Sequence, residues 1–102
     1  MSFRRDKQKA LRWQKWLQRN RDSVLACGVP LQVVENERYW FYFLDHGYFT
    51  PQGSETPLIT IRRMSEVDAA ALCLFLEQDD LYPRSVALQD LRNRLGKGHE
   101  SV

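Results

Sequence analysis

Apolar and polar residues alternate with a helical period over the first quarter of the chain. At about 100° per residue, one stripe of a helix collects the apolar residues and leaves the basic ones opposite. The apolar stripe consists of Phe3, Ala10, Trp13, Leu17 and Val24. Gly28 and Pro30 follow, which is typical of a helix end. The pattern predicts one long amphipathic helix from Phe3 to about Ala26.

The run from Tyr39 to Leu44 is apolar on every face, so periodicity does not decide its structure. Its aromatic residues favour a strand. The flanking residues favour a helix, because Asn36 suits an N-cap and Gly47 suits the left-handed position after a helix end. We predict a helix here. The preceding segment, Leu31–Val34, is either a short strand or one helical turn opened by Pro30.

The second half of the chain predicts one strand and two helices. Leu58–Arg62 alternates briefly, and Leu31–Glu35 is the partner we expect for it. Ser65 suits the N-cap of a helix whose run Ala69–Leu76 is apolar all round, which predicts a central place in the core. After a loop, a last helix is expected from Ser85 to about Leu95.

These elements predict a mainly α fold, a small domain of about four helices with at most a short β-hairpin. The alternative is an α+β fold with a small antiparallel sheet in residues 31–62. With 102 residues, the chain is expected to form a single domain, residues 1–102, with a flexible tail from about residue 97. Three Trp, five Phe and four Tyr predict a core rich in aromatic rings.

Charge is divided along the chain more sharply than the net charge of +2 suggests. The first 21 residues hold eight basic residues and one acid, whereas residues 22–83 hold three basic residues and ten acids. The acidic middle could therefore pair with the basic helix within one molecule. In particular, the carboxylates of residues 77–80 stand at the unfavourable end of a helix, where cations of the first helix would stabilise them.

The chain shows no pattern typical of catalysis, of a cofactor or of a metal site. Asp45 and His46 are adjacent, but neighbouring residues on a helix point in different directions. Cys27 and Cys73 are nucleophiles by residue type only, and two separated His and two separated Cys lack zinc-site spacing. We expect a protein that is not an enzyme. The basic start is not followed by an apolar signal region, so we expect reduced thiols, a cytoplasmic location and no membrane contact.

Two surfaces are candidates for binding a partner. The first is the basic side of the opening helix, with Trp16 at its border, and the second is a patch of tyrosines. The residues that we expect to contact a partner are Arg5, Arg12, Lys15, Trp16, Arg19, Tyr39, Tyr42 and Tyr48. The hypothesis is a small interaction protein (adaptor, inhibitor or neutralising partner) that docks an acidic protein or a second copy of itself. The alternative is a nucleic-acid-binding protein, in which the cations neutralise phosphates and Trp16 stacks on a base.

Overall fold

The computed structural model describes residues 3–78 and 85–96, and within these ranges all side chains except those of residues 3–7, 9 and 10. In chain order the elements are α1 (Phe3–Ala26), α2 (Leu31–Val34), α3 (Glu37–His46), β1 (Tyr48–Phe49), β2 (Ile59–Thr60), the 3₁₀ turn η1 (Ile61–Arg63), α4 (Glu66–Glu77) and α5 (Val86–Arg94). The prediction of a mainly α fold with at most a short hairpin is confirmed, because the antiparallel sheet that the alternative placed in residues 31–62 is limited to the pairing of β1 with β2. The expected tail from residue 97 lies outside the described residues.

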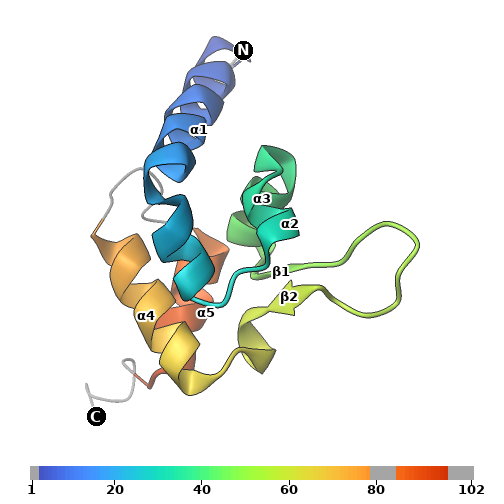
Figure 1. Ribbon diagram of the computed structural model, residues 1–102, viewed down its shortest axis with the longest axis vertical. Helices are drawn as coiled ribbons and strands as arrows, with labels where there is room; N and C mark the ends of the chain where they lie inside the picture. Colours follow the sequence, from blue (N-terminus) through green and yellow to red (C-terminus); the bar gives the residue numbers. More distant parts are fainter. Residues whose placement is uncertain (1–2, 79–84, 97–102) are drawn as a thin grey trace.

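Helix α1 is long and bent, and its first half extends beyond the rest of the chain (Figure 1). The bend falls at Asn20, whose backbone leaves the helical region (φ −116°, ψ 15°). Its side-chain amide donates to the carbonyl of Trp16, 2.9 Å away, and so competes with the backbone bonds of the helix. Gly28 ends the segment with φ 86°, and a Cβ there would meet Oδ2 of Asp68 at 2.6 Å. The positive φ favours glycine at this position, and a larger residue would also have to displace the Asp68 carboxylate.

Helix α3 begins and ends as its flanking residues predict. The side chain of Asn36 accepts hydrogen bonds from the backbone N–H groups of Arg38 and Tyr39, and Gly47 takes the left-handed conformation at φ 81°. The chain then turns into β1, which pairs antiparallel with β2, Tyr48 opposite Thr60 and Phe49 opposite Ile59. The run of aromatic residues therefore forms a helix.

The predicted pairing of Leu58–Arg62 with Leu31–Glu35 is wrong. The backbone N–H groups of Val33 and Val34 both donate to the carbonyl of Pro30, so this segment closes into the helical turn α2. In the predicted strand Leu58–Arg62, the strand β2 covers only Ile59 and Thr60, because η1 begins at the next residue. Residues 48–49 supply the partner strand instead, since Gly47 reverses the chain next to them.

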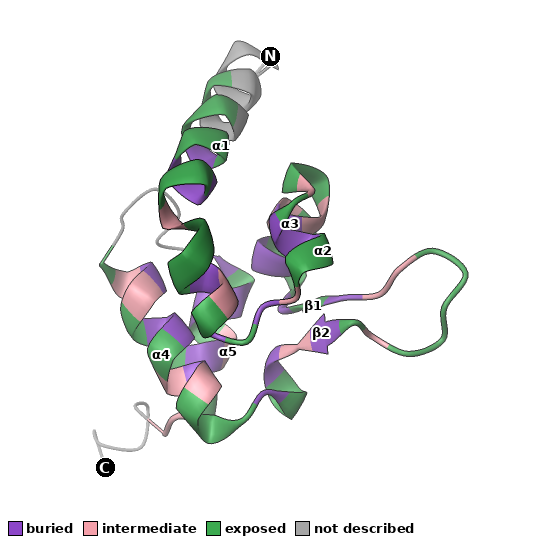
Figure 2. Cartoon of the chain, in the orientation of Figure 1, coloured by how far each residue is buried: buried purple, intermediate pink, exposed green. Residues whose placement is uncertain are grey.

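Helix α4 is less buried than its composition predicts. Ser65 caps it by accepting from the backbone N–H of Asp68, as expected. Its inner side buries Ala69, Leu72, Cys73 and Leu76, but its outer side is exposed (Figure 2). Helix α5 and α1 pack against its flanks and leave that outer side open. The prediction of a helix surrounded by core is therefore wrong.

The hydrophobic core joins all the helices and is centred on aromatic rings. Trp13 and Trp16 of α1 meet Trp40 of α3, with ring centroids 6.0 and 6.3 Å away, and lie 4.8 Å from each other. Edge-to-face and stacked arrangements of this kind add to the stabilisation that burial gives. The tryptophan cluster packs the middle of α1 against α3. This contact determines which side of α1 faces the solvent.

Candidate interaction surfaces

Three cations of α1 form an exposed stripe, here called the basic arc: Arg12, Lys15 and Arg19. Their spacing of three and four residues brings neighbouring side chains together on one side of the helix, over a length of about 10 Å. None of the three forms an ion pair within the described part of the chain. Within residues 3–78 and 85–96, the expected pairing of the basic helix with acids of the same chain is therefore seen for Arg21 and not for the basic arc.

The described ion pairs involve other residues. Arg21 of α1 meets Glu35 at 3.1 Å, and Arg92 of α5 meets Glu77 at 2.8 Å. In the described part of the chain, a cation from α5 thus reaches the acidic end of α4, whereas we expected one from the first helix. Asp79 and Asp80, the other acids expected at that end, lie outside the described residues.

Trp16 does not lie at the exposed border of the basic face. Its side chain is only 4% exposed, because Phe75 of α4 covers it with ring centroids 5.1 Å apart and Trp40 stacks on it. The sequence places Trp16 between the apolar and basic sides, and the packing of α4 against that border decides its burial. Arg5 lies within α1, but its side chain is not described.

The tyrosines expected at a partner surface come together around Phe49. Tyr39 stacks on Phe49 at 4.3 Å between ring centroids, and Tyr42 meets Phe49 and Tyr48 edge to face at 6.0 and 5.9 Å. His46 stacks on Tyr42 at 3.9 Å, which the sequence did not indicate. Tyr42 and Tyr48 are each 40% exposed. The hydrogen bond between their hydroxyls raises the pKa of Tyr42 above its ordinary value, and desolvation adds to this.

The basic arc and this aromatic patch do not adjoin. Arg19 lines a hollow together with Phe75 and Gln78 of α4, whereas the opposite flank of α1 faces α2 and the start of α3. The sequence hypothesis assigned both surfaces to the docking of a partner. The structure separates them: α4 flanks the Arg19 end of the arc, whereas the aromatic patch belongs to α3 and β1.

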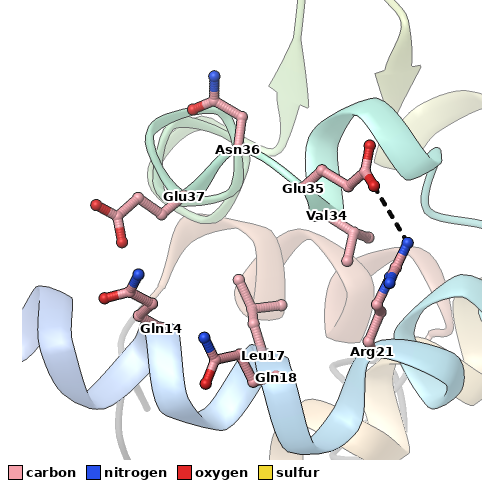
Figure 3. Close-up of a pocket in the computed structure, with 8 residues that line it drawn as sticks. All are labelled: Gln14, Leu17, Gln18, Arg21, Val34, Glu35, Asn36 and Glu37. Carbon is pink, nitrogen blue, oxygen red and sulfur yellow. Dashed lines mark hydrogen bonds and ion pairs between the residues drawn. The ribbon is translucent and has the colours of Figure 1, made fainter.

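A polar groove on that opposite flank was not expected from the sequence. It has a volume of about 500 Å³ and lies between α1 and the α2–α3 segment (Figure 3). Leu17 and Val34 point toward one another inside it, and the Arg21–Glu35 ion pair lies at one end (Figure 3). Its lining residues are Gln14, Leu17, Gln18, Arg21, Val34, Glu35, Asn36 and Glu37. The sequence does not indicate this groove, because glutamines on the flank of an amphipathic helix are also common on ordinary surface.

The two cysteines and His46 are the described side chains that the sequence raised as candidates for catalysis. Cys27 and Cys73 are both buried, and neither forms a disulfide. Burial raises the pKa of Cys27, and the nearby Asp68 carboxylate raises it further, so the thiol form is favoured. Nδ1 of His46 lies 2.9 Å from the carbonyl of Tyr42, where it donates in the Nδ1–H tautomer. Among the described residues, no three His, Cys, Asp or Glu side chains are grouped as a metal ion would require.

Comparison with protein-family models, curated proteins and solved structures found no match to this chain. Within the described residues, no helix has the length and apolar character needed to cross a membrane. A proposal for the function therefore depends on the surfaces described above.

Proposed function

We propose that this chain is a non-catalytic binding protein that docks an acidic protein partner through the basic arc of α1. The observation that carries the proposal is that Arg12, Lys15 and Arg19 are all exposed and have no ion-pair partner in the described part of the chain. Aligned like charges repel one another, so the arc is relieved when carboxylates approach it.

The arc is also held in place. The opposite side of α1 buries Trp13, Leu17 and Val24, which fixes the rotation of the helix about its axis. A cationic stripe on a fixed helix is preorganised, and less conformational entropy is lost when a partner binds. Two of its three cations are arginines, whose planar guanidinium groups pair with carboxylates through two parallel hydrogen bonds.

A protein partner is favoured over nucleic acid because the one base-stacking residue expected at this surface is buried. Binding to single strands combines phosphate neutralisation with aromatic rings that stack on bases. Trp16 is covered by Phe75 and Trp40, and the exposed tyrosines belong to a surface that does not adjoin the arc. The arc alone offers charge without a stacking platform.

The test compares two variants with the same change in net charge. One reverses the arc (Arg12→Glu, Lys15→Glu, Arg19→Glu), and the control reverses three exposed arginines elsewhere (Arg38→Glu, Arg62→Glu, Arg63→Glu). Each protein is immobilised and exposed to nuclease-treated extract of its native host, and the proteins retained by the original chain and the control but lost by the arc variant are identified. The leading candidate is then purified and titrated calorimetrically at two salt concentrations.

We expect the arc reversal to weaken binding by at least about tenfold, with a further loss at high salt, and the control to bind as the original chain does. The proposal is wrong if both variants retain the same proteins or lose the same proteins. It is also wrong if labelled single-stranded or duplex DNA binds the original chain at physiological salt and the arc reversal abolishes that binding.

A further inference from the structure

The outer side of α4 carries an apolar stripe that is unusual for a surface helix. Val67, Ala71 and Leu74, here called the outer stripe, repeat at intervals of four and three residues and are all exposed. Val67 is 79% exposed and Leu74 is 58% exposed. Single exposed apolar residues are ordinary, but a row of them at helical spacing is typical of a surface that another molecule covers.

The outer stripe borders the basic arc. Between the two helices lies a hollow of about 240 Å³, formed by Trp16, Arg19 and Asn20 of α1 with Phe75 and Gln78 of α4. Phe75 is half-buried in it and directly follows Leu74. A molecule that covers the outer stripe and reaches across the hollow therefore meets Arg19 first and the rest of the arc along α1.

We infer that this surface receives an amphipathic helix of another protein, with apolar residues along one stripe and carboxylates along the flank that faces α1. The inference rests on the proposed function and specifies the partner's form. Two helices side by side present side chains and no free strand edge, so the surface suits a helix laid into a groove rather than an added strand. Ala71, at the centre of the outer stripe, is small enough to let a helix approach closely.

Charge selects the occupant. The arc starts at Arg19 next to the hollow and continues along α1 through Lys15 and Arg12, and none of the three has a carboxylate partner in the described part of the chain. A second copy of this chain would add three more cations of the same kind, whereas a partner with an acidic flank pairs them. Opposite charge at the border of an apolar contact also fixes the orientation and register of the bound helix.

The test uses a defined probe and matched variants. The probe is a short stapled helical peptide with leucines at stripe spacing and glutamates along one flank, and its control carries lysines in place of the glutamates. The stripe variant is Val67→Gln with Leu74→Gln, and the control variant is Leu31→Gln with Val86→Gln, which alters two apolar residues exposed on other elements. Because all four side chains are exposed, the variants are expected to fold, and circular dichroism checks this.

We expect the acidic peptide to bind and to shift NMR resonances of residues 67–78 and 12–19, and the lysine peptide not to bind. The stripe variant should weaken binding about tenfold or more, and the control variant should not. No saturable binding of the acidic peptide, or equal binding by the stripe variant, overturns the inference. So does sedimentation analysis that shows a dimer of the original chain which the stripe variant abolishes.

The partner identified with the arc reversal and its control variant also shows which of the two proposals fails. If the arc reversal loses that partner and the stripe variant keeps it, the partner binds through charge alone, and only the helix inference falls. If the arc reversal keeps every partner, both fall. Loss of the same partner by both variants supports both.

Discussion

Helices α3 and α4 both contain a run that is apolar on every face, yet they present different chemistry to the solvent. Helix α3 turns Arg38, Tyr42 and His46 outward, and the ring of Tyr42 meets that of Tyr48 edge to face. Helix α4 turns outward the hydrocarbon side chains of Val67 and Leu74. The two helices are otherwise alike, because each begins at a side-chain N-cap and buries one side in the common core.

The difference explains why we propose a partner for the exposed surface of α4 rather than for that of α3. A tyrosine has an apolar ring and a polar hydroxyl, so it covers core residues while its hydroxyl remains in water. Valine and leucine have no polar group, so their exposure to water does not stabilise the isolated chain. Composition alone treats both runs as equally apolar. The positions that face outward make the surface of α4 the more informative of the two.

The largest effect is expected on the buried sides, where the two helices should behave alike. Trp40 of α3 and Leu72 of α4 have no exposed side-chain area. Trp40→Ala should lower the free energy of unfolding by about 3–5 kcal/mol, and Leu72→Ala by about 2–5 kcal/mol, since each leaves a cavity. Urea denaturation followed by circular dichroism measures both values.

Leu31→Ala, at an exposed position of α2, is the control and should change stability by less than about 0.5 kcal/mol. A loss below about 1 kcal/mol for Leu72→Ala would contradict the burial of α4. The assignment of Val67, Ala71 and Leu74 to the solvent-facing side of α4 would then lose its basis, because it depends on the burial of the opposite side.

An intermediate effect is expected where the two helices begin. Asn36 accepts from two backbone N–H groups of α3, and Ser65 accepts from one at the start of α4. Asn36→Ala and Ser65→Ala should each cost about 1 kcal/mol in the free energy of unfolding. Ser23→Ala, at an exposed position inside α1, is the control and should cost nothing, because alanine favours a helix interior. Equal values for all three variants would show that the caps are not formed.

These caps also explain how much of the fold the sequence predicts. Asn36, Gly47 and Ser65 act locally, through the backbone groups next to them, and the helices they bound were predicted correctly. The partner of the strand near residue 59 was not, because pairing depends on where Gly47 and Pro30 send the chain. Local chemistry determines an element, whereas the arrangement of elements depends on contacts distant in sequence.

The same distinction applies to the candidate sites. The spacing of Arg12, Lys15 and Arg19 places them on one exposed side of a helix, as predicted. Burial of Trp16 was missed because it depends on Phe75, nearly sixty positions further along the chain. The outer stripe was missed for a related reason, since an evenly apolar run does not reveal which of its sides other helices cover.

The smallest effect concerns the exposed side of α3, where the two tyrosine hydroxyls interact. The hydrogen bond with Tyr48 is the largest cause of the raised pKa of Tyr42. Tyr48→Phe should therefore lower the pKa of Tyr42 toward its ordinary value. Tyr39→Phe is the control, because it removes a phenol and leaves the Tyr42–Tyr48 pair intact. NMR of chains carrying ¹³C-labelled tyrosine follows the titration of Tyr42 in each variant.

The sign of the effect on stability follows from the direction of the shift. A pKa that is higher in the folded state means that folding favours the protonated phenol, so this contribution is fully present below pH of about 10 and is lost as the pH rises through the folded-state pKa of Tyr42. In Tyr48→Phe, that alkaline loss should shrink. If Tyr42 titrates identically in this variant, its hydroxyl is not engaged with Tyr48. An interaction between the two tyrosines would then not distinguish the outer side of α3 from the hydrocarbon surface of α4.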